Sequence, residues 1–342
     1  MLVGIDTLGL KPGWGGGEEI YLRNVLSKMA QFERSARFLV FTDPENHDSY
    51  EPYDRVCVND PDTLDDLASE HKVDLLFSSV LRAPARGTVP IVLYVMELRS
   101  LVSDNRSRRR GAAAAHLKDI KHLCARARTF VAPSDFMKQQ ILDVLEVPLN
   151  RTLVAPLGVA EAFGTPQDCI IEKPYILMVG NTHSYKNYDA VMEAFERISR
   201  DLPHNLVIVG QPFEAEREEW GARVIRIDRL PVPQLAGLYQ HCAVFVCASS
   251  YEGSGVTVIE ALMAGALVAS GRVGGITEIA SDAPIFFNAG SVDSLVAALR
   301  RGVQEGEDSR MRRSRSGKQL ASEYTWERCA TQTMSAFRRA LR

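Results

Sequence analysis

The chain has 342 residues, of which 46% are hydrophobic and 24% are charged, and its formal net charge is −3. This composition is ordinary for a globular protein, and the length allows two domains that each bury a core. The slight acidic excess argues against a general nucleic-acid binder, so we expect no nucleic acid among the partners. No stretch reaches about 18 consecutive apolar residues and no signal peptide is recognisable, so we expect a cytoplasmic protein without a transmembrane helix.

Short apolar runs separated by longer amphipathic segments make up the first half of the chain. A first strand is predicted at residues 2–5, and a glycine-rich segment follows it. The helix predicted at residues 18–32 is expected to bury one apolar face, made of Ile20, Leu22, Val25, Leu26, Met29 and Phe32. Further strands are predicted at residues 38–41, 75–77, 91–95 and 129–132 and at a run ending near Ala155. Ser134 is expected to cap a helix over residues 135–145.

The second half repeats this pattern. Strands are predicted at residues 176–179, 206–209, 224–227, 244–247 and 267–269. Continuous apolar strands separated by helices indicate parallel sheets covered on both faces, and hence two doubly wound α/β domains. We expect an N-terminal domain over residues 1–160 and a C-terminal domain over residues 161–325, with the seam within residues 156–174. A final helix at about residues 326–342 is expected to return to the N-terminal domain.

Residues 251–260, YEGSGVTVIE, carry the strongest functional signal in the chain. They follow the strand at 244–247 and lead into a helix, so the glycines form a turn at a helix N-terminus. Backbone N–H groups and the helix dipole favour a phosphate at such a turn. Glu252 and Glu260 could accept hydrogen bonds from sugar hydroxyls on either side of it. Taken singly, these residues are also ordinary carboxylates of a turn and of a helix start.

Lys186 lies between the strand at 175–179 and the helix that begins at about Tyr188. A lysine in a strand-to-helix loop is a natural counter-charge for a diphosphate, because its donors can follow a leaving group. Alone, it is equally an ordinary solvated lysine of a loop. The segment containing Asp60 and Asp62 is interpreted as a turn, and the six cysteines lack metal-binding spacing, so no metal site is expected.

Four segments occur in the following order along the chain: VGNTHSYKNYDAVMEAF, LVIVGQ, YEGSGVTVIEALMAGALVASGRVGGITEIASDA and YTWERCA. Together they resemble the nucleotide-sugar-binding half of retaining GT-B glycosyltransferases of family 4, the glycosyl transferases group 1. The resemblance implies an α/β fold of two facing Rossmann-like domains with an interdomain cleft. It implies that Glu252 contacts the donor sugar, Glu260 holds the ribose and Lys186 neutralises the diphosphate. The implied catalytic residues are Glu252 and Lys186.

The resemblance also implies a wider donor-binding set. In the second half it consists of Gly180, Asn181, Gly210, Leu230, Gly253, Ser254, Gly255, Val256, Thr257 and Glu260. In the first half it consists of Gly15, Gly16 and Gly17. These last three also suit a mere flexible turn, and they do not complete a dinucleotide-binding fingerprint because Glu18 stands where the third glycine would be.

The chain departs from the family pattern at three places. Met96 and Glu97 stand where many relatives have His-Asp, and both are expected on the acceptor side. A thioether cannot replace the hydrogen bonding of an imidazole. Asn181 and Tyr185 stand where relatives often carry basic residues, so we expect fewer cations around the diphosphate.

The resemblance implies retaining, metal-independent transfer of a hexosyl group, with mannosyl among the candidates. The donor would be a GDP- or UDP-linked sugar, with no other cofactor. The acceptor would be a hydroxyl of a saccharide, a glycolipid or another small molecule, as in polysaccharide biosynthesis. Two alternatives stay open: a GT-B sugar-nucleotide epimerase, and a catalytically weak module that binds nucleotide sugars.

Residues 99–128 are rich in arginine and lysine. Such a segment is typical of peripheral enzymes that bind an anionic membrane surface, here at the inner face of the membrane. A solvated helix face, or a positive patch that attracts an anionic substrate, explains it equally well.

Overall fold

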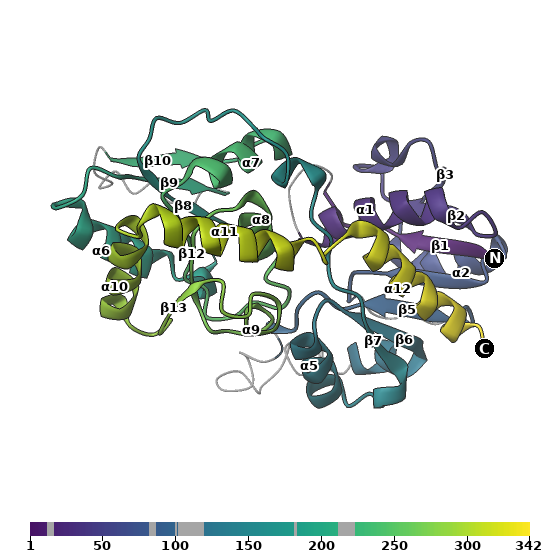
Figure 1. Cartoon of the computed structure of the whole chain (residues 1–342). Helices are drawn as coiled ribbons and strands as arrows, with labels where there is room; N and C mark the ends of the chain where they lie inside the picture. Colours follow the sequence, from purple (N-terminus) through teal and green to yellow (C-terminus); the bar gives the residue numbers. More distant parts are fainter. Residues whose placement is uncertain (12–16, 82–86, 100, 102–119, 181–182, 211–222) are drawn as a thin grey trace. The chain divides into compact units, whose positions relative to one another are not determined.

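The computed structural model describes residues 1–11, 17–81, 87–99, 101, 120–180, 183–210 and 223–342 (Figure 1). The chain divides into two compact units. The N-terminal unit comprises Met1–Leu157 and Trp326–Arg342, and the C-terminal unit comprises Gly158–Thr325. The boundary therefore falls within the seam predicted at residues 156–174.

The N-terminal unit is built on a parallel sheet whose described strands are ordered β3-β2-β1-β4-β5-β6-β7. The strands are β1 (Leu2–Asp6), β2 (Arg37–Thr42), β3 (Asp54–Cys57), β4 (Leu75–Ser78), β5 (Ile91–Tyr94), β6 (Ala127–Ala132) and β7 (Thr152–Val154). The prediction missed β3 because this edge strand reads DRVC, has no apolar run and is nowhere fully buried. The order of the strands reverses at β1, as in doubly wound folds, whose ligands bind beyond the carboxyl ends of the strands.

Helices cover the sheet of the N-terminal unit. The described helices are α1 (Gly17–Phe32), α2 (Leu64–Glu70), α5 (Asp135–Leu145) and α12 (Trp326–Ala340), with short 3₁₀ turns at η1 (His47–Tyr50), η2 (Pro61–Thr63) and η4 (Leu149–Arg151). The prediction that Ser134 caps α5 is confirmed, because its side chain accepts a hydrogen bond from Met137 N.

The buried face of α1 differs in part from the predicted one. Leu22, Val25, Leu26 and Met29 are buried as expected, together with Tyr21, but Ile20 is 37% exposed and Phe32 is 57% exposed. Ile20 precedes Leu22 by two residues, which is about half a helical turn, so it points away from the core. Phe32 is the last residue of the helix.

The final helix, α12, returns to the N-terminal unit as predicted, and it packs against α1 and against β5, β6 and β7 (Figure 1). Phe337 lies edge-on to Phe77 of β4, with ring centroids 4.9 Å apart. Thr333 shares a buried hydrogen bond of 3.1 Å with the hydroxyl of Tyr21. The ring of Tyr21 stacks on that of Tyr94. Buried aromatic pairs of this kind fix the helix in one orientation on the sheet.

The C-terminal unit repeats the doubly wound plan, and its described strands are ordered β10-β9-β8-β11-β12-β13, all parallel. The strands are β8 (Tyr175–Val179), β9 (Asn205–Val209), β10 (Val224–Ile227), β11 (Val244–Cys247), β12 (Val268–Gly271) and β13 (Ile285–Phe287). The helices are α6 (Tyr188–Ser199), α7 (Val232–His241), α8 (Val256–Ala264), α9 (Ile276–Ile279), α10 (Val292–Val303) and α11 (Glu307–Ala321), with 3₁₀ turns at η5 (Glu161–Phe163) and η6 (Ser184–Lys186).

Alternate residues of the strands in the C-terminal unit enter two separate apolar clusters. Leu177 and Phe245 belong to the cluster that α7 and α8 cover, whereas Ile176 and Val244 belong to the cluster that α6 and α10 cover. A sheet buried on both faces explains why its strands read as continuous apolar runs. The strand β13, which only three residues form, was not predicted.

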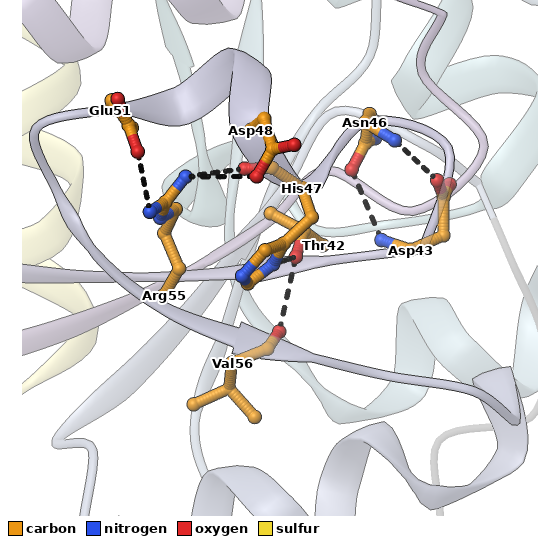
Figure 2. A network of polar contacts seen from close by, with 8 residues as sticks. All are labelled: Thr42, Asp43, Asn46, His47, Asp48, Glu51, Arg55 and Val56. Carbon is orange, nitrogen blue, oxygen red and sulfur yellow. Dashed lines mark hydrogen bonds and ion pairs between the residues drawn. The ribbon is translucent and has the colours of Figure 1, made fainter.

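A polar network holds the loop that follows β2 in the N-terminal unit (Figure 2). Asn46 is fully buried and donates from Nδ2 to the carbonyls of Thr7 and Leu10, at 2.8 and 2.9 Å. Its Oδ1 accepts a hydrogen bond from Asp43 N at 3.1 Å. Asp43 Oδ2 in turn accepts one from Gly9 N at 2.7 Å. The network therefore fixes the loop after β1, which leads toward the predicted glycine-rich segment.

Replacing Asn46 with alanine should lower the free energy of unfolding by about 2 kcal/mol, because the buried carbonyl of Leu10 loses its described donor and that of Thr7 keeps only Leu10 N. Urea denaturation monitored by circular dichroism measures this change. Asn24 is a matched control, because its exposed side chain donates only to Ile20 O in its own helix. If Asn46→Ala were no more destabilising than Asn24→Ala, the buried amide would not hold the loop.

Candidate functional site

Lys186 and Glu252 meet in the C-terminal unit. Lys186 ends η6, after the carboxyl end of β8, and Glu252 lies in the turn between β11 and α8. Since β8 and β11 are neighbours in the sheet, their carboxyl ends bring the two loops together. Lys186 Nζ donates to Glu252 Oε1 at 2.6 Å, and the two side chains are only 11% and 10% exposed. They form a nearly buried ion pair.

The loops that carry this pair are joined by hydrogen bonds. Asn187 adopts a left-handed backbone conformation and donates from Nδ2 to Ala248 O at 2.8 Å. Ser250 N donates to Tyr185 O at 2.7 Å. On the other side, Gly275 N donates to Glu252 O at 2.9 Å. Three loops at the carboxyl ends of β8, β11 and β12 therefore hold the backbone around Lys186 and Glu252.

The surroundings of Lys186 favour its charged form. Burial disfavours the ammonium ion, but the carboxylate of Glu252 outweighs this effect and raises the pKa of Lys186 above its usual range. The ammonium group also lies 5.1 Å from the ring centroid of Tyr185, which stacks on the ring of His183. At the position where relatives often carry an arginine, this chain thus places an aromatic face near the lysine.

The helix α8 begins directly after Gly255, whose φ is +63°. A Cβ atom at this residue would lie 2.6 Å from Cδ1 of Ile279, so glycine is required by both its backbone conformation and the lack of space. Gly253 and Gly255 are buried, whereas Ser254, Val256 and Thr257 are partly exposed. The first N–H groups of a helix lack partners within the helix, so this end can accept an anion.

Glu260 lies on α8, and its Oε2 accepts a hydrogen bond of 3.3 Å from the hydroxyl of Tyr239 on α7. Burial raises the pKa of Glu260 from 4.5 to about 7, and the hydrogen bond from Tyr239 only partly opposes this rise. A carboxylate in such surroundings gains from additional hydroxyl donors. Sequence reasoning missed Tyr239, because nothing in the pattern of α7 distinguishes it from a core residue.

The other predicted donor residues of the C-terminal unit lie at strand ends. The backbone N–H of Gly180 donates to Val209 O, and that of Gly210 donates to Ile227 O, so both glycines continue the sheet at its carboxyl edge. The aliphatic part of the Lys186 side chain packs over Gly180, because a Cβ atom added to this glycine would lie 3.6 Å from Cε of Lys186. Leu230 packs against the apolar cluster under α7 and α8. Asn181 lies outside the described residues.

The N-terminal unit brings together a second set. Gly17 begins α1, and a Cβ atom there would lie 3.6 Å from Cε of Met96, which follows β5. Glu97 Oε2 lies 3.6 Å from Arg99 Nε. Glu18, which was considered only as a missing glycine, lies in the first turn of α1, and burial together with the charge of Glu97 raises its pKa to about 7. Gly15 and Gly16 lie outside the described residues.

Two further expectations concern metals and membrane-spanning helices. Among the described residues, no group of three or more His, Cys, Asp or Glu side chains is arranged to hold a metal ion. Likewise, none of the helices in the described ranges is long and apolar enough to cross a membrane.

Within the basic segment, residues 100 and 102–119 lie outside the described part of the chain. Of the basic side chains described there, Arg99, Lys121 and Arg126 each pair with a carboxylate, those of Glu97, Glu146 and Asp65. Arg128 is exposed at the start of β6.

Comparison with known proteins gives a match to a family model and a fold. Residues 170–320 match the family model described as Glycosyl transferases group 1. Over 235 residues the chain is 24% identical to O-antigen chain mannosyltransferase B of Escherichia coli. That alignment covers 62% of this chain and 61% of the relative, so less than two thirds of the relative's length is matched.

The solved structures that resemble the chain cover almost all of it. Sucrose-phosphate synthase from Thermosynechococcus elongatus matches with a TM-score of 0.78 and 17% identity, over 99% of this chain and 98% of that one. Anabaena HepE, solved in complex with UDP and glucose, matches with a TM-score of 0.78 and 14% identity, over 99% of each chain. These similarities confirm the predicted GT-B fold of two Rossmann-like domains.

Proposed function

We propose that the chain, whose residues 170–320 match the family model described as Glycosyl transferases group 1, transfers a hexosyl group from a nucleoside-diphosphate sugar to an acceptor hydroxyl, with retention at the anomeric carbon. The observation that supports this most directly is the nearly buried pair of Lys186 and Glu252 beside the start of α8. The site combines one cation, one carboxylate and the free N–H groups of a helix end.

Each part of this site has a chemical task in the proposed reaction. Negative charge grows on the diphosphate as the glycosidic bond breaks, and an ammonium group stabilises that charge more strongly in the transition state than in the ground state. Lys186 supplies this group. The N–H groups that follow Gly255 hold the phosphates, and Glu252 accepts hydrogen bonds from hydroxyls of the donor sugar. The proposal includes no enzyme nucleophile and no metal.

The proposed ribose site is Glu260. Its carboxylate has one described hydrogen-bond donor, Tyr239, whereas a carboxylate can accept several more. The two hydroxyls of a ribose would supply these donors and stabilise the charged form. In the N-terminal unit, Gly17 is proposed to contact the donor phosphates, and Met96 and Glu97 to contact the acceptor.

Among hexoses, we propose mannose first, carried by GDP, because the matched Escherichia coli relative is a mannosyltransferase. UDP-linked donors are the second choice, because HepE was solved with UDP and glucose. The proposed acceptor is a saccharide or a glycolipid. The proposed setting is the cytoplasm or the inner face of the membrane.

A sugar-nucleotide epimerase is the second candidate, and one observation favours it. The pKa of Glu18, raised to about 7 by burial and by the charge of Glu97, suits proton transfer near neutral pH. An epimerase needs such a proton-transferring group. Transfer in which the acceptor attacks from the same face as the departing phosphate does not need one.

A panel of labelled nucleotide sugars, incubated with and without a saccharide and glycolipid extract, tests the proposal. We expect label to enter an acceptor only when the extract is present, to do so best from GDP-mannose, and to persist with a metal chelator. An isomerised nucleotide sugar formed without extract would indicate the epimerase. A donor that raises the melting temperature but is never turned over would indicate a binding module.

A further inference from the structure

The N-terminal unit has a polar pocket of about 620 Å³ at the edge of the sheet opposite Met96 and Glu97. Val89 and Pro90 line it just before β5, Arg128 lines it at the start of β6, and Arg151 lines it just before β7. In a parallel sheet these residues share the amino edge, whereas Met96 follows the carboxyl end of β5. The pocket is therefore separate from the proposed transfer site.

The lining of this pocket has one sign of charge. Among the described residues, the lining contains five arginines and no aspartate or glutamate. These arginines are Arg126, Arg128, Arg151, Arg339 and Arg342. Like charges that converge in a concavity repel one another, and the walls of a pocket concentrate their field, so an anion gains more there than on a flat surface.

Two of the arginines are held in place by the protein. Arg126 donates to both carboxylate oxygens of Asp65, at 2.9 and 3.2 Å, and to Val89 O. Arg151 donates to the carbonyls of Arg128 and Cys124, and its guanidinium lies over the ring of Phe130. These contacts make rigid walls and neutralise only one of the five charges.

In the part of the chain that the structure describes, the remaining arginines have no such acceptors. Arg128, Arg339 and Arg342 are exposed, and none of them pairs with a carboxylate within the described ranges. The neighbouring Arg338, by contrast, pairs with Glu33 on another face of α12. Guanidinium groups bind phosphate oxygens through paired hydrogen bonds, and a pocket of this volume is of the size that holds a small molecule.

We propose that this pocket binds a phosphate-bearing anion, with Arg128 and Arg339 as the groups that contact it directly. The ligand is recognised by two or more negative charges on adjacent phosphate oxygens. Such chemistry is offered either by a soluble diphosphate or by the head group of an anionic lipid. Arg126 and Arg151 hold the wall in place, and Arg151 also supplies positive charge.

The test uses inorganic pyrophosphate as the probe and the Lys186→Ala protein as the background, so that the proposed donor site contributes little to binding. In this background, the pair Arg128→Ala and Arg339→Ala should weaken pyrophosphate binding about tenfold in calorimetry, because two charge-assisted contacts are lost. Arg34→Ala with Lys72→Ala is the matched control, since both are exposed cations of the same unit. The control should bind pyrophosphate as the background does.

A second arm distinguishes the sources of the phosphate. Co-sedimentation with vesicles of phosphatidylglycerol and phosphatidylcholine should depend on Arg128 and Arg339 if a lipid head group is the ligand. Weaker binding of either probe by the variant with Arg128→Ala and Arg339→Ala, but not by the control, supports the proposal. The probe that is affected identifies the source of the phosphate. If the pocket variant and the control variant bind both probes alike, while circular dichroism shows both folded, the pocket is no anion site and the proposal is overturned.

Discussion

Replacing Lys186 with alanine should lower kcat for sugar transfer about a thousandfold, because the substitution removes the cation that stabilises the leaving diphosphate. Glu252→Gln should lower it by a similar factor, since an amide is a weaker acceptor for the sugar hydroxyls. The matched control is Lys318→Ala, which removes an exposed lysine of α11 in the same unit. Steady-state assays with the donor identified by the panel measure all three variants.

The same pair makes a separate prediction about stability. Each single substitution leaves one charge nearly buried without its partner, and should cost about 3 kcal/mol of unfolding free energy. The double variant, Lys186→Ala with Glu252→Gln, should recover much of that loss but none of the activity. Urea denaturation of the four proteins checks this cycle. Recovery of transfer in the double variant, or near-normal turnover in both single variants, would rule out the assigned roles.

Replacing Glu260 with glutamine should stabilise the protein at about pH 8 and have little effect at about pH 5. The carboxyl group has a pKa of about 7 in the folded protein and 4.5 as its ordinary value. The folded state therefore binds more protons between these values, and stability falls as the pH rises through this window. Above it, the charged Glu260 costs about 3 kcal/mol, which the neutral amide avoids. Urea denaturation at the two pH values measures the difference.

The Glu260→Gln variant should also bind the nucleotide more weakly than the wild-type protein, although it is the more stable of the two at about pH 8. Ribose hydroxyls would bind the charged carboxylate, whose population rises as the pH passes through about 7. The affinity of the wild-type protein relative to the variant should therefore rise about tenfold or more between pH 5 and pH 8. Because the phosphates of the nucleotide titrate equally in both experiments, the ratio isolates Glu260. A ratio independent of pH would exclude contact between Glu260 and the ribose.

Much of the fold could be predicted because parallel strands buried on both faces must be apolar throughout. The eleven strands read from such runs are present, and the helices α1, α5, α6 and α12 begin within about two residues of their predicted starts. The failures have local reasons. The edge strand β3 carries Asp54 and Arg55 and needs no apolar run, and Ile20 is apolar but lies on the outer side of α1.

The candidate site was predictable to the extent that it depends on strand ends. Lys186 and Glu252 each follow an apolar run, and this position alone sends them to the carboxyl edge of a sheet. Tyr239 and the raised pKa of Glu18 could not be predicted in this way. Both depend on which side chains become neighbours after packing, and a helix sequence does not specify its partners.

The sequence by itself determined the alternation of strands and helices, the GT-B fold and the positions of the residues assigned to the donor. Only the tertiary structure decided that Lys186 and Glu252, 66 residues apart, neutralise each other at 2.6 Å. It likewise decided that arginines from the starts of β6 and β7 and from the end of the chain at α12 line one pocket. The physical reason is the same in both cases. Local periodicity sets which way a side chain points and where a strand ends, whereas the order of strands in the sheet sets which ends are adjacent.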